Sequence, residues 1–198
     1  MTAAPRVYFV IGPAGSGKTG VARLIAELSG AAYLDKDTAC TRLTEALLEL
    51  AGTDRNERDL NPYYQSVVMD LEYATILDLA ADNLSLGRPV VLDAPFGRYF
   101  SQPDYLAEVT YRHSWSSEAE LVVVQVQVDK DTARERVRAR GCARDRSKLA
   151  DWDTFWKTAE ANECQWVDGR RLVFDNRADG VTADAVARTL GELDRSSP

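Results

Sequence analysis

The chain has 198 residues, of which 45% are hydrophobic and 28% charged, enough for one α/β domain with a sizeable core. Its formal net charge of −7 argues against the broad basic surface that binds duplex nucleic acid, so a nucleic-acid partner is disfavoured and a small molecule is favoured. No apolar stretch approaches the roughly 20 residues that span a bilayer. We therefore expect a single cytoplasmic domain over residues 1–198 without a membrane partner, either monomeric or a homodimer.

Strand-like runs alternate with helical segments along the whole chain. Strands are expected at residues 6–11, 31–35, 89–93, 121–129 and 171–175. Helices are expected at residues 18–29, 37–51, 63–86, 131–140, 151–163 and 182–193. This alternation predicts parallel β-α units, and the β-branched runs at 90–92 and 121–128 are typical of strands that flank a central first strand.

Residues 12–19, GPAGSGKT, follow the first strand and match the phosphate-binding pattern G-x-x-x-x-G-K-[ST]. Glycines there allow successive backbone N–H groups to turn inward, and the following helix adds its positive end. We expect Lys18 to reach the β- and γ-phosphates and the Thr19 hydroxyl to coordinate Mg²⁺. The complete predicted loop is Gly12, Pro13, Ala14, Gly15, Ser16, Gly17, Lys18 and Thr19.

Two aspartates stand at the ends of neighbouring strands, Asp35 in AAYLDKD and Asp93 in PVVLDAPF. Ligands gather just outside the carboxyl ends of parallel strands, so either carboxylate is a candidate for the metal side of a magnesium–triphosphate site. Both also have a structural alternative, as a helix N-cap or a turn residue. Three cysteines, Cys40, Cys142 and Cys164, lack the spacing of a zinc site or a disulfide framework.

The segments GPAGSGKT, LDKD, VLDAPF and RARGCARDRSKL together resemble the small P-loop kinases of the nucleotide-kinase-like group. The chain is most similar to the zeta-toxin-like and chloramphenicol-phosphotransferase-like kinases, and more distantly to shikimate kinase, gluconate kinase and the 5′-polynucleotide kinase domain. This resemblance implies a three-layer P-loop fold with a five-stranded parallel sheet in the order 2-3-1-4-5. It also implies ATP and Mg²⁺ as cofactors and a hydroxyl as the phosphate acceptor.

By the spacing of that family, Asp37 is the candidate general base, with Asp35 as its metal-side or orienting partner. A carboxylate within ~3 Å of an alcohol can take its proton as the phosphate is transferred. The alternative for Asp37 is the N-cap of the next helix. The polynucleotide kinases have an arginine three residues after the base, where this chain has Cys40, which disfavours a nucleic-acid acceptor.

The resemblance implies that residues 131–150 form a lid, and this segment contains the dense basic run DTARERVRARGCARDRSK. This segment resembles the helical flap whose arginines close over ATP phosphates in the family, so Arg140 and Arg144 are the candidate phosphate contacts, with Arg138 and Arg146 in reserve. The alternative is a solvated helix face. Asn176, after the last strand, is a candidate for framing the adenine, with a plain turn as the alternative.

The acceptor site is expected between the exit of the second strand, the 63–86 helix and the loop after Asp93. Its predicted residues are Asp37, Arg55, Tyr63, Phe96 and Arg98, and Arg58, Tyr64, Tyr99 and Asp104 are further candidates. Large aromatic residues are more often core than ligand-binding, so the four tryptophans are weaker candidates for the lid side.

These features favour an ATP-dependent kinase acting on a hydroxyl of a nucleoside, sugar, amino sugar or antibiotic. One alternative is a slow NTPase switch or partner-binding module, although the chain lacks the N-K-x-D motif of the GTPases. Another is a kinase for a sugar nucleotide or a 5′-hydroxyl polynucleotide, and steep salt dependence of binding would indicate the latter. The sequence leaves the acceptor and the choice between ATP and GTP open.

Overall fold

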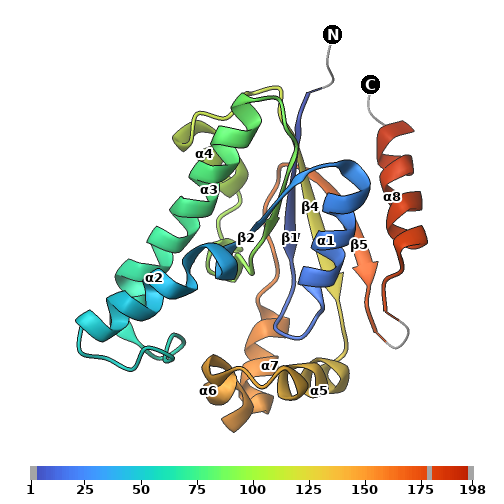
Figure 1. The fold of residues 1–198 in the computed structure, drawn as a ribbon. Helices are drawn as coiled ribbons and strands as arrows, with labels where there is room; N and C mark the ends of the chain where they lie inside the picture. Colours follow the sequence, from blue (N-terminus) through green and yellow to red (C-terminus); the bar gives the residue numbers. More distant parts are fainter. Residues whose placement is uncertain (1–3, 178–179, 196–198) are drawn as a thin grey trace.

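The computed structural model describes residues 4–177 and 180–195. Five parallel strands form one sheet in the order β2-β3-β1-β4-β5, which confirms the predicted fold class and strand order (Figure 1). The strands are β1 (Arg6–Ile11), β2 (Ala32–Asp35), β3 (Val90–Asp93), β4 (Glu120–Gln127) and β5 (Arg170–Asp175). Their carboxyl ends share one edge of the sheet, where Asp35 stands in register with Asp93.

Helices cover both faces of the sheet and also its carboxyl edge (Figure 1). Helices α1 (Lys18–Ser29) and α8 (Ala183–Arg195) cover one face, while α3 (Met69–Ser85) and α4 (Tyr105–Arg112) cover the other, with α2 (Lys36–Leu50) packed on α3. The carboxyl edge carries α5 (Lys130–Arg140), α6 (Arg146–Ala150) and α7 (Trp152–Ala161). Within the described residues, no helix is both long and apolar enough to cross a membrane.

The central strand β1 supplies side chains to both hydrophobic layers. Val7, Phe9 and Ile11 pack in the cluster under α3 and α4, whereas Tyr8 and Val10 pack in the cluster under α1 and α8. Alternate residues of a strand point to opposite faces, so a strand buried on both faces needs an almost continuous apolar run. This double burial fixes the starting point of the phosphate-binding loop.

Several elements differ from the sequence-based expectation. The eight residues of α4 were not expected as a helix, because so short a segment carries too few turns for a clear 3.6-residue period. The helix expected at 63–86 begins as a π-helical turn, Tyr64–Val68, before α3. The fourth strand ends at Gln127 rather than 129, because Asp129 caps α5 and accepts a hydrogen bond from Thr132 N at 2.9 Å.

The packing of α3 yields a stability prediction. Ile76 is fully buried in the core, whereas Leu79 on the same helix is 40% exposed. We expect Ile76→Ala to lower the free energy of unfolding by about 2–5 kcal/mol, because it removes buried apolar contacts and leaves a cavity. Leu79→Ala is the matched control and should change it by less than ~1 kcal/mol. Urea denaturation measures both, and equal losses would contradict the assignment of the core face.

Candidate active site

The loop between β1 and α1 is held in a conformation that only glycine adopts easily. Gly15 and Gly17 have φ angles of 80° and 83°, in the left-handed region. A Cβ atom on Gly15 would collide with the carbonyl of Ala133 in α5, and one on Gly17 would collide with the Asn176 amide. The glycines therefore let α5 and the exit of β5 approach the loop closely, leaving a cradle of backbone N–H groups suited to a phosphate.

Lys18, the first residue of α1, directs its ammonium group back over this loop. Its Nζ donates a hydrogen bond to Pro13 O at 2.9 Å. Burial lowers the pKa of Lys18 to about 8, although the nearby Asp93 carboxylate acts in the opposite direction. A desolvated ammonium that donates to a loop carbonyl fits a group whose remaining donors bind phosphate oxygens.

Asn176, at the exit of β5, and Arg136, in α5, support the phosphate-binding loop through hydrogen bonds. The Asn176 side chain donates from Nδ2 to Ser16 O at 2.6 Å and accepts at Oδ1 from Val181 N at 2.9 Å. Arg136, in α5, donates from Nη1 to Asn176 O at 2.9 Å. Asn176 is buried and its amide is used by the loop, so its structural role differs from the predicted contact with adenine. Arg136 was not singled out in the sequence, because nothing distinguishes it from its basic neighbours.

Asp93, at the end of β3, lies beside the helix that begins at Lys18. Burial raises its pKa, while hydrogen bonds from Thr19 and Tyr33 oppose that effect. The Tyr33 hydroxyl donates to Asp93 Oδ2 at 2.8 Å and lies 3.4 Å from Asp35 Oδ2. Thr19 and Asp93 together offer hard oxygen donors next to the phosphate cradle, which fits Mg²⁺, an ion that keeps several waters and needs few protein ligands.

Asp35 adopts the structural alternative considered for it, as the N-cap of α2. Its Oδ1 accepts from Asp37 N at 2.8 Å and from Thr38 N at 3.3 Å. The cap fixes the first turn of α2 and thereby the direction of Asp37. Within the described residues, no group of three or more His, Cys, Asp or Glu side chains forms a metal cluster.

Asp37 is therefore free of the capping role and sits among three cations. Its Oδ2 is 2.6 Å from Arg144 Nη2, and its Oδ1 is 3.7 Å from both Lys36 Nζ and Arg58 Nη1. Burial raises the pKa of Asp37, but the surrounding positive charges outweigh burial and hold it below its ordinary value. The carboxylate is thus ionised at neutral pH and able to accept a proton.

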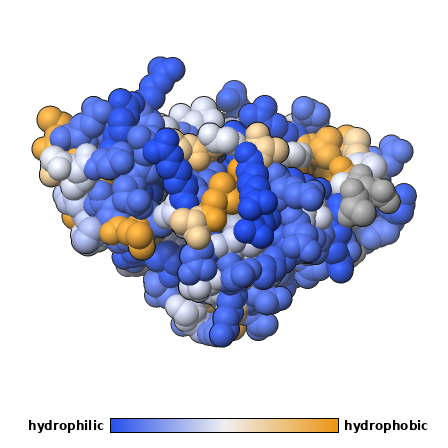
Figure 2. All heavy atoms as spheres, turned by 90° about the horizontal axis from the view of Figure 1, so that it is seen from below, coloured by the Kyte–Doolittle hydropathy of each residue, from blue (hydrophilic) through white to orange (hydrophobic). Residues whose placement is uncertain are grey.

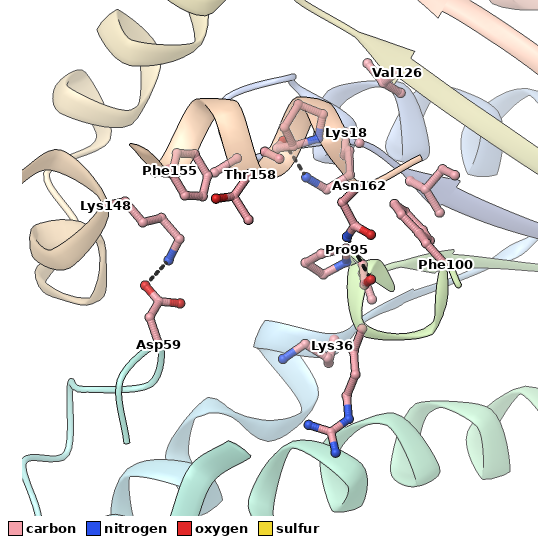
Figure 3. A pocket seen from close by; sticks show the side chains of 18 of the residues that line it. Lys18, Lys36, Asp59, Pro95, Phe100, Val126, Lys148, Phe155, Thr158 and Asn162 are labelled. Carbon is pink, nitrogen blue, oxygen red and sulfur yellow. Dashed lines mark hydrogen bonds and ion pairs between the residues drawn. The ribbon is translucent and has the colours of Figure 1, made fainter. Parts of the chain in front are cut away.

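The lid bends where α5 ends, because Gly141 takes a left-handed φ of 61°. Arg140 then forms a bidentate pair with the buried carboxylate of Asp145, at 2.7 and 2.8 Å. On the far side of the lid, Lys148 Nζ lies 2.6 Å from Asp59 Oδ2 (Figure 3). The lid therefore contacts α2 through Arg144 and the segment before α3 through Lys148. Seen from the lid side, the surface is largely hydrophilic with scattered hydrophobic residues (Figure 2).

One cleft of about 1170 Å³ joins these parts. In Figure 3 Lys18 and Lys36 lie on different sides of the same space. The predicted residues that line the cleft are Gly12, Pro13, Ala14, Lys18, Thr19, Asp35, Asp37, Asp93, Arg98, Arg140 and Arg144, together with the further candidates Arg58 and Tyr64. Sequence reasoning placed Lys148 in the basic run without assigning it a contact, and it missed Asp59, since an aspartate in a polar segment carries no distinguishing signal.

Three predicted acceptor residues do not reach the cleft. Phe96 is fully buried in the core, where its ring lies 5.4 Å from that of Phe9. Tyr63 points away at the start of the π-helical turn, and it is Tyr64 that lines the cleft. Arg55 is drawn to the surface of α2, where it pairs with Glu45 and Glu49. Arg98 does line the cleft, and its Nη1 donates to Gln65 O at 2.7 Å.

Comparison with known proteins places this arrangement in a family. A family model described as an AAA domain matches residues 7–161. The chain belongs to this AAA domain family. No curated protein sequence matches it.

Solved structures with the same fold cover almost the whole chain. A Chloroflexus aurantiacus J-10-fl protein provisionally assigned as a kinase is 16% identical, with a TM-score of 0.65 over 96% of this chain and 98% of that chain. An unliganded sugar kinase from Janibacter sp. HTCC2649 is 15% identical, with a TM-score of 0.61 over 97% of this chain and 96% of that chain. A gluconokinase from Sinorhizobium meliloti 1021 is 18% identical, with a TM-score of 0.54 over 98% of this chain and 94% of that chain. The AAA-family chain thus has the fold of small P-loop kinases.

The brace under the loop gives a prediction for nucleotide binding. We expect Asn176→Ala to lower the free energy of unfolding by about 1–3 kcal/mol and to weaken ATP binding, because the Ser16 carbonyl and the Val181 N–H lose their partner. Urea denaturation and ATP titration measure the two effects. Asn83→Ala is the control, since the Asn83 amide bonds only to Leu79 O within α3. Unchanged ATP affinity in Asn176→Ala would contradict the bracing role.

Proposed function

We propose that this protein is an ATP-dependent phosphotransferase that moves the γ-phosphate to a hydroxyl of a small molecule. The observation that carries the proposal is that an ionised carboxylate, Asp37, shares one cleft with the phosphate-binding loop and two lid arginines. The fold of small P-loop kinases and the AAA family assignment support it. The acidic net charge disfavours a nucleic-acid acceptor.

Each part of the cleft then has a role. The loop N–H groups and Lys18 hold the β- and γ-phosphates, and Thr19 and Asp93 hold Mg²⁺, with Asp35 as a further oxygen donor. Bound Mg²⁺ would supply neutralisation of phosphate charge. Asp37 takes the proton of the acceptor hydroxyl while the hydroxyl oxygen forms a bond to the γ-phosphorus. The bond between the γ-phosphorus and the β,γ-bridging oxygen breaks at the same time. The products are ADP, the phosphorylated alcohol and a proton released to solvent.

Arg144 links the lid to the base. It pairs with Asp37, so it must leave that carboxylate before the acceptor hydroxyl can approach. We infer that Arg144 moves to the transferring phosphate and joins Arg140 there, where a guanidinium stabilises developing charge. Loss of this neighbouring cation raises the pKa of Asp37, and a carboxylate of higher pKa is the better base.

Substitution of the base tests the function directly. We expect Asp37→Asn to reduce acceptor-dependent ADP release by about 10²-fold or more while leaving ATP affinity unchanged, since an amide cannot take the proton. The assay is ADP release from Mg²⁺-ATP with a panel of nucleosides, sugars, amino sugars and hydroxyl-bearing antibiotics. Asp82→Asn, at an exposed position of α3, is the matched control. Slow ADP release that ignores both acceptor and substitution would favour an NTPase switch instead.

The pKa of Lys18 makes a separate prediction about nucleotide binding. Because this pKa is lowered to about 8, Lys18 is mostly neutral at pH 8.5 in the free protein, and phosphate charge raises the pKa again. ATP binding at pH 8.5 should therefore take up as much as about one proton. Calorimetry in buffers of different ionisation enthalpy measures the uptake.

Lys18→Arg is the control for this measurement, because a guanidinium keeps its proton at all accessible pH values. It should bind ATP without proton uptake. Binding to the wild-type protein at pH 8.5 with no dependence on the buffer would contradict the lowered pKa.

A further inference from the structure

A buried polar cluster lies behind Asp37 at the acceptor end of the cleft. Lys36, Arg58 and Glu72 are 5%, 7% and 2% exposed, so three charged side chains are almost removed from water. Buried charges are costly unless they are paired and fully hydrogen-bonded. The hydrogen bonds within the cluster therefore show which of these charged groups has enough hydrogen-bond partners within the protein.

Glu72 is complete. Its Oε2 accepts from Lys36 Nζ and from the Tyr64 hydroxyl, the latter at 2.8 Å, and its Oε1 accepts from Thr44 Oγ1 at 2.6 Å. One ammonium and two hydroxyl donors satisfy both carboxylate oxygens. Lys36 and Glu72 thus form a closed pair that stabilises the first turn of α2 against α3.

The guanidinium of Arg58, in contrast, has fewer hydrogen-bond acceptors than donors around it. A guanidinium has five N–H donors, yet within residues 4–177 and 180–195 the side chain makes one long hydrogen bond, from Nη2 to Thr41 Oγ1 at 3.4 Å. Its Nη1 is 3.6 Å from Glu72 Oε1 and 3.7 Å from Asp37 Oδ1, close enough for attraction but beyond hydrogen bonding. The buried Nε has no partner among the described residues. A guanidinium in this state is short of acceptor oxygens.

The position of Arg58 is fixed independently of those contacts. Its backbone carbonyl accepts a hydrogen bond from Gln65 Nε2 at 3.1 Å, and the Tyr64 ring lies 5.8 Å from its guanidinium carbon. Its side chain lines the cleft together with Asp37. An under-bonded cation on a tethered backbone beside the base is the arrangement of a binding residue.

The ion pairs around Asp37 leave Arg58 as the cation that faces the acceptor. Lys36 pairs with Glu72, and Arg144 leaves Asp37 for the transferring phosphate in the proposed mechanism. Arg58 then remains near both Asp37 and Glu72 but at 3.7 and 3.6 Å, beyond hydrogen-bonding distance of either carboxylate. We propose that Arg58 binds an anionic oxygen group of the acceptor, a carboxylate or a phosphate ester, while Asp37 faces the hydroxyl of the same molecule. The acceptor class is therefore a hydroxyl-bearing acid, an inference that rests on the proposed function.

The lid reinforces this assignment. Asp59, next to Arg58 in the chain, contacts both Lys148 and Ser147, the latter at 2.9 Å. When the lid is latched here, it covers the segment that carries Arg58 and reduces its access to water. A planar guanidinium binds carboxylate or phosphate through two parallel hydrogen bonds, and these bonds strengthen as water is excluded.

The test compares acceptors in matched pairs that differ only in charge. Three such pairs are a hydroxy acid and its amide, an aldonic acid and its aldose, and a sugar phosphate and its parent sugar. We expect kcat/KM for at least one acidic member to exceed that of its neutral partner by about 10-fold or more, because charged hydrogen bonds contribute about 1.5–3 kcal/mol each. The carboxylate and phosphate pairs separate the two sources of anionic oxygen.

Arg58→Gln should raise KM for the preferred acid by about 10- to 100-fold and change KM for its neutral partner by less than about 2-fold. Arg55→Gln, an exposed arginine outside the cleft, is the matched control and should change neither. If Arg58 instead only positioned Asp37, kcat would fall equally for both members of each pair. That result, or a general preference for neutral acceptors, would overturn the proposal.

Two further measurements keep the outcome decisive. Arg58→Lys retains the charge without the planar fork, so it serves if Arg58→Gln does not fold, and it should weaken the acid more than the neutral partner. Calorimetric binding of the same acids, without turnover, separates the two levels of inference. Arg58-dependent binding without ADP release would support the anion site and reject the kinase activity. Acceptor-dependent ADP release without a preference for acids would support the kinase activity and reject the anion site.

Discussion

The site depends on one constraint, the parallel pairing that brings the carboxyl ends of β1, β2 and β3 to a common edge. Gly12 follows β1 directly, and the register of β2 and β3 sets Asp35 beside Asp93. The hydroxyl of Tyr33 then lies between these two carboxylates. The sheet therefore places the glycine loop next to the carboxylates proposed as oxygen donors for Mg²⁺, without any contribution from residues 131–150.

Two partly exposed ion pairs join residues 143–150 to the other side of the cleft. The side chains of Lys148 and Asp59 are 20% and 36% exposed, and those of Arg144 and Asp37 are 27% and 41% exposed. Exposed ion pairs typically contribute ~0–1 kcal/mol each, so both can exchange for phosphate or water at small cost. Because one of these pairs involves Asp37, breaking it would change the charge around that carboxylate.

The sequence predicted those features whose backbone geometry is tied to a motif or to the periodicity of a strand. The glycine loop and the alternation of strands and helices follow from such patterns, whereas the strand order and the candidate positions of Asp37, Arg140 and Arg144 came from the resemblance to small P-loop kinases. Side-chain direction outside regular elements does not, and Phe96 shows why: its left-handed φ of 54° turns the ring into the core. Glu72 was equally hidden, since a carboxylate within an amphipathic helix usually marks the solvated face.

The contrast between Arg140 and Arg58 shows how the inventory of hydrogen bonds separates two arginines in one cleft. Arg140 is held by two hydrogen bonds to Asp145, so its side chain is already placed without a ligand. Arg58 is more deeply buried yet makes one long bond, so its burial opposes folding more than it supports it. A ligand that supplies the missing oxygens recovers that free energy on binding, and such a group therefore discriminates between acceptors by charge.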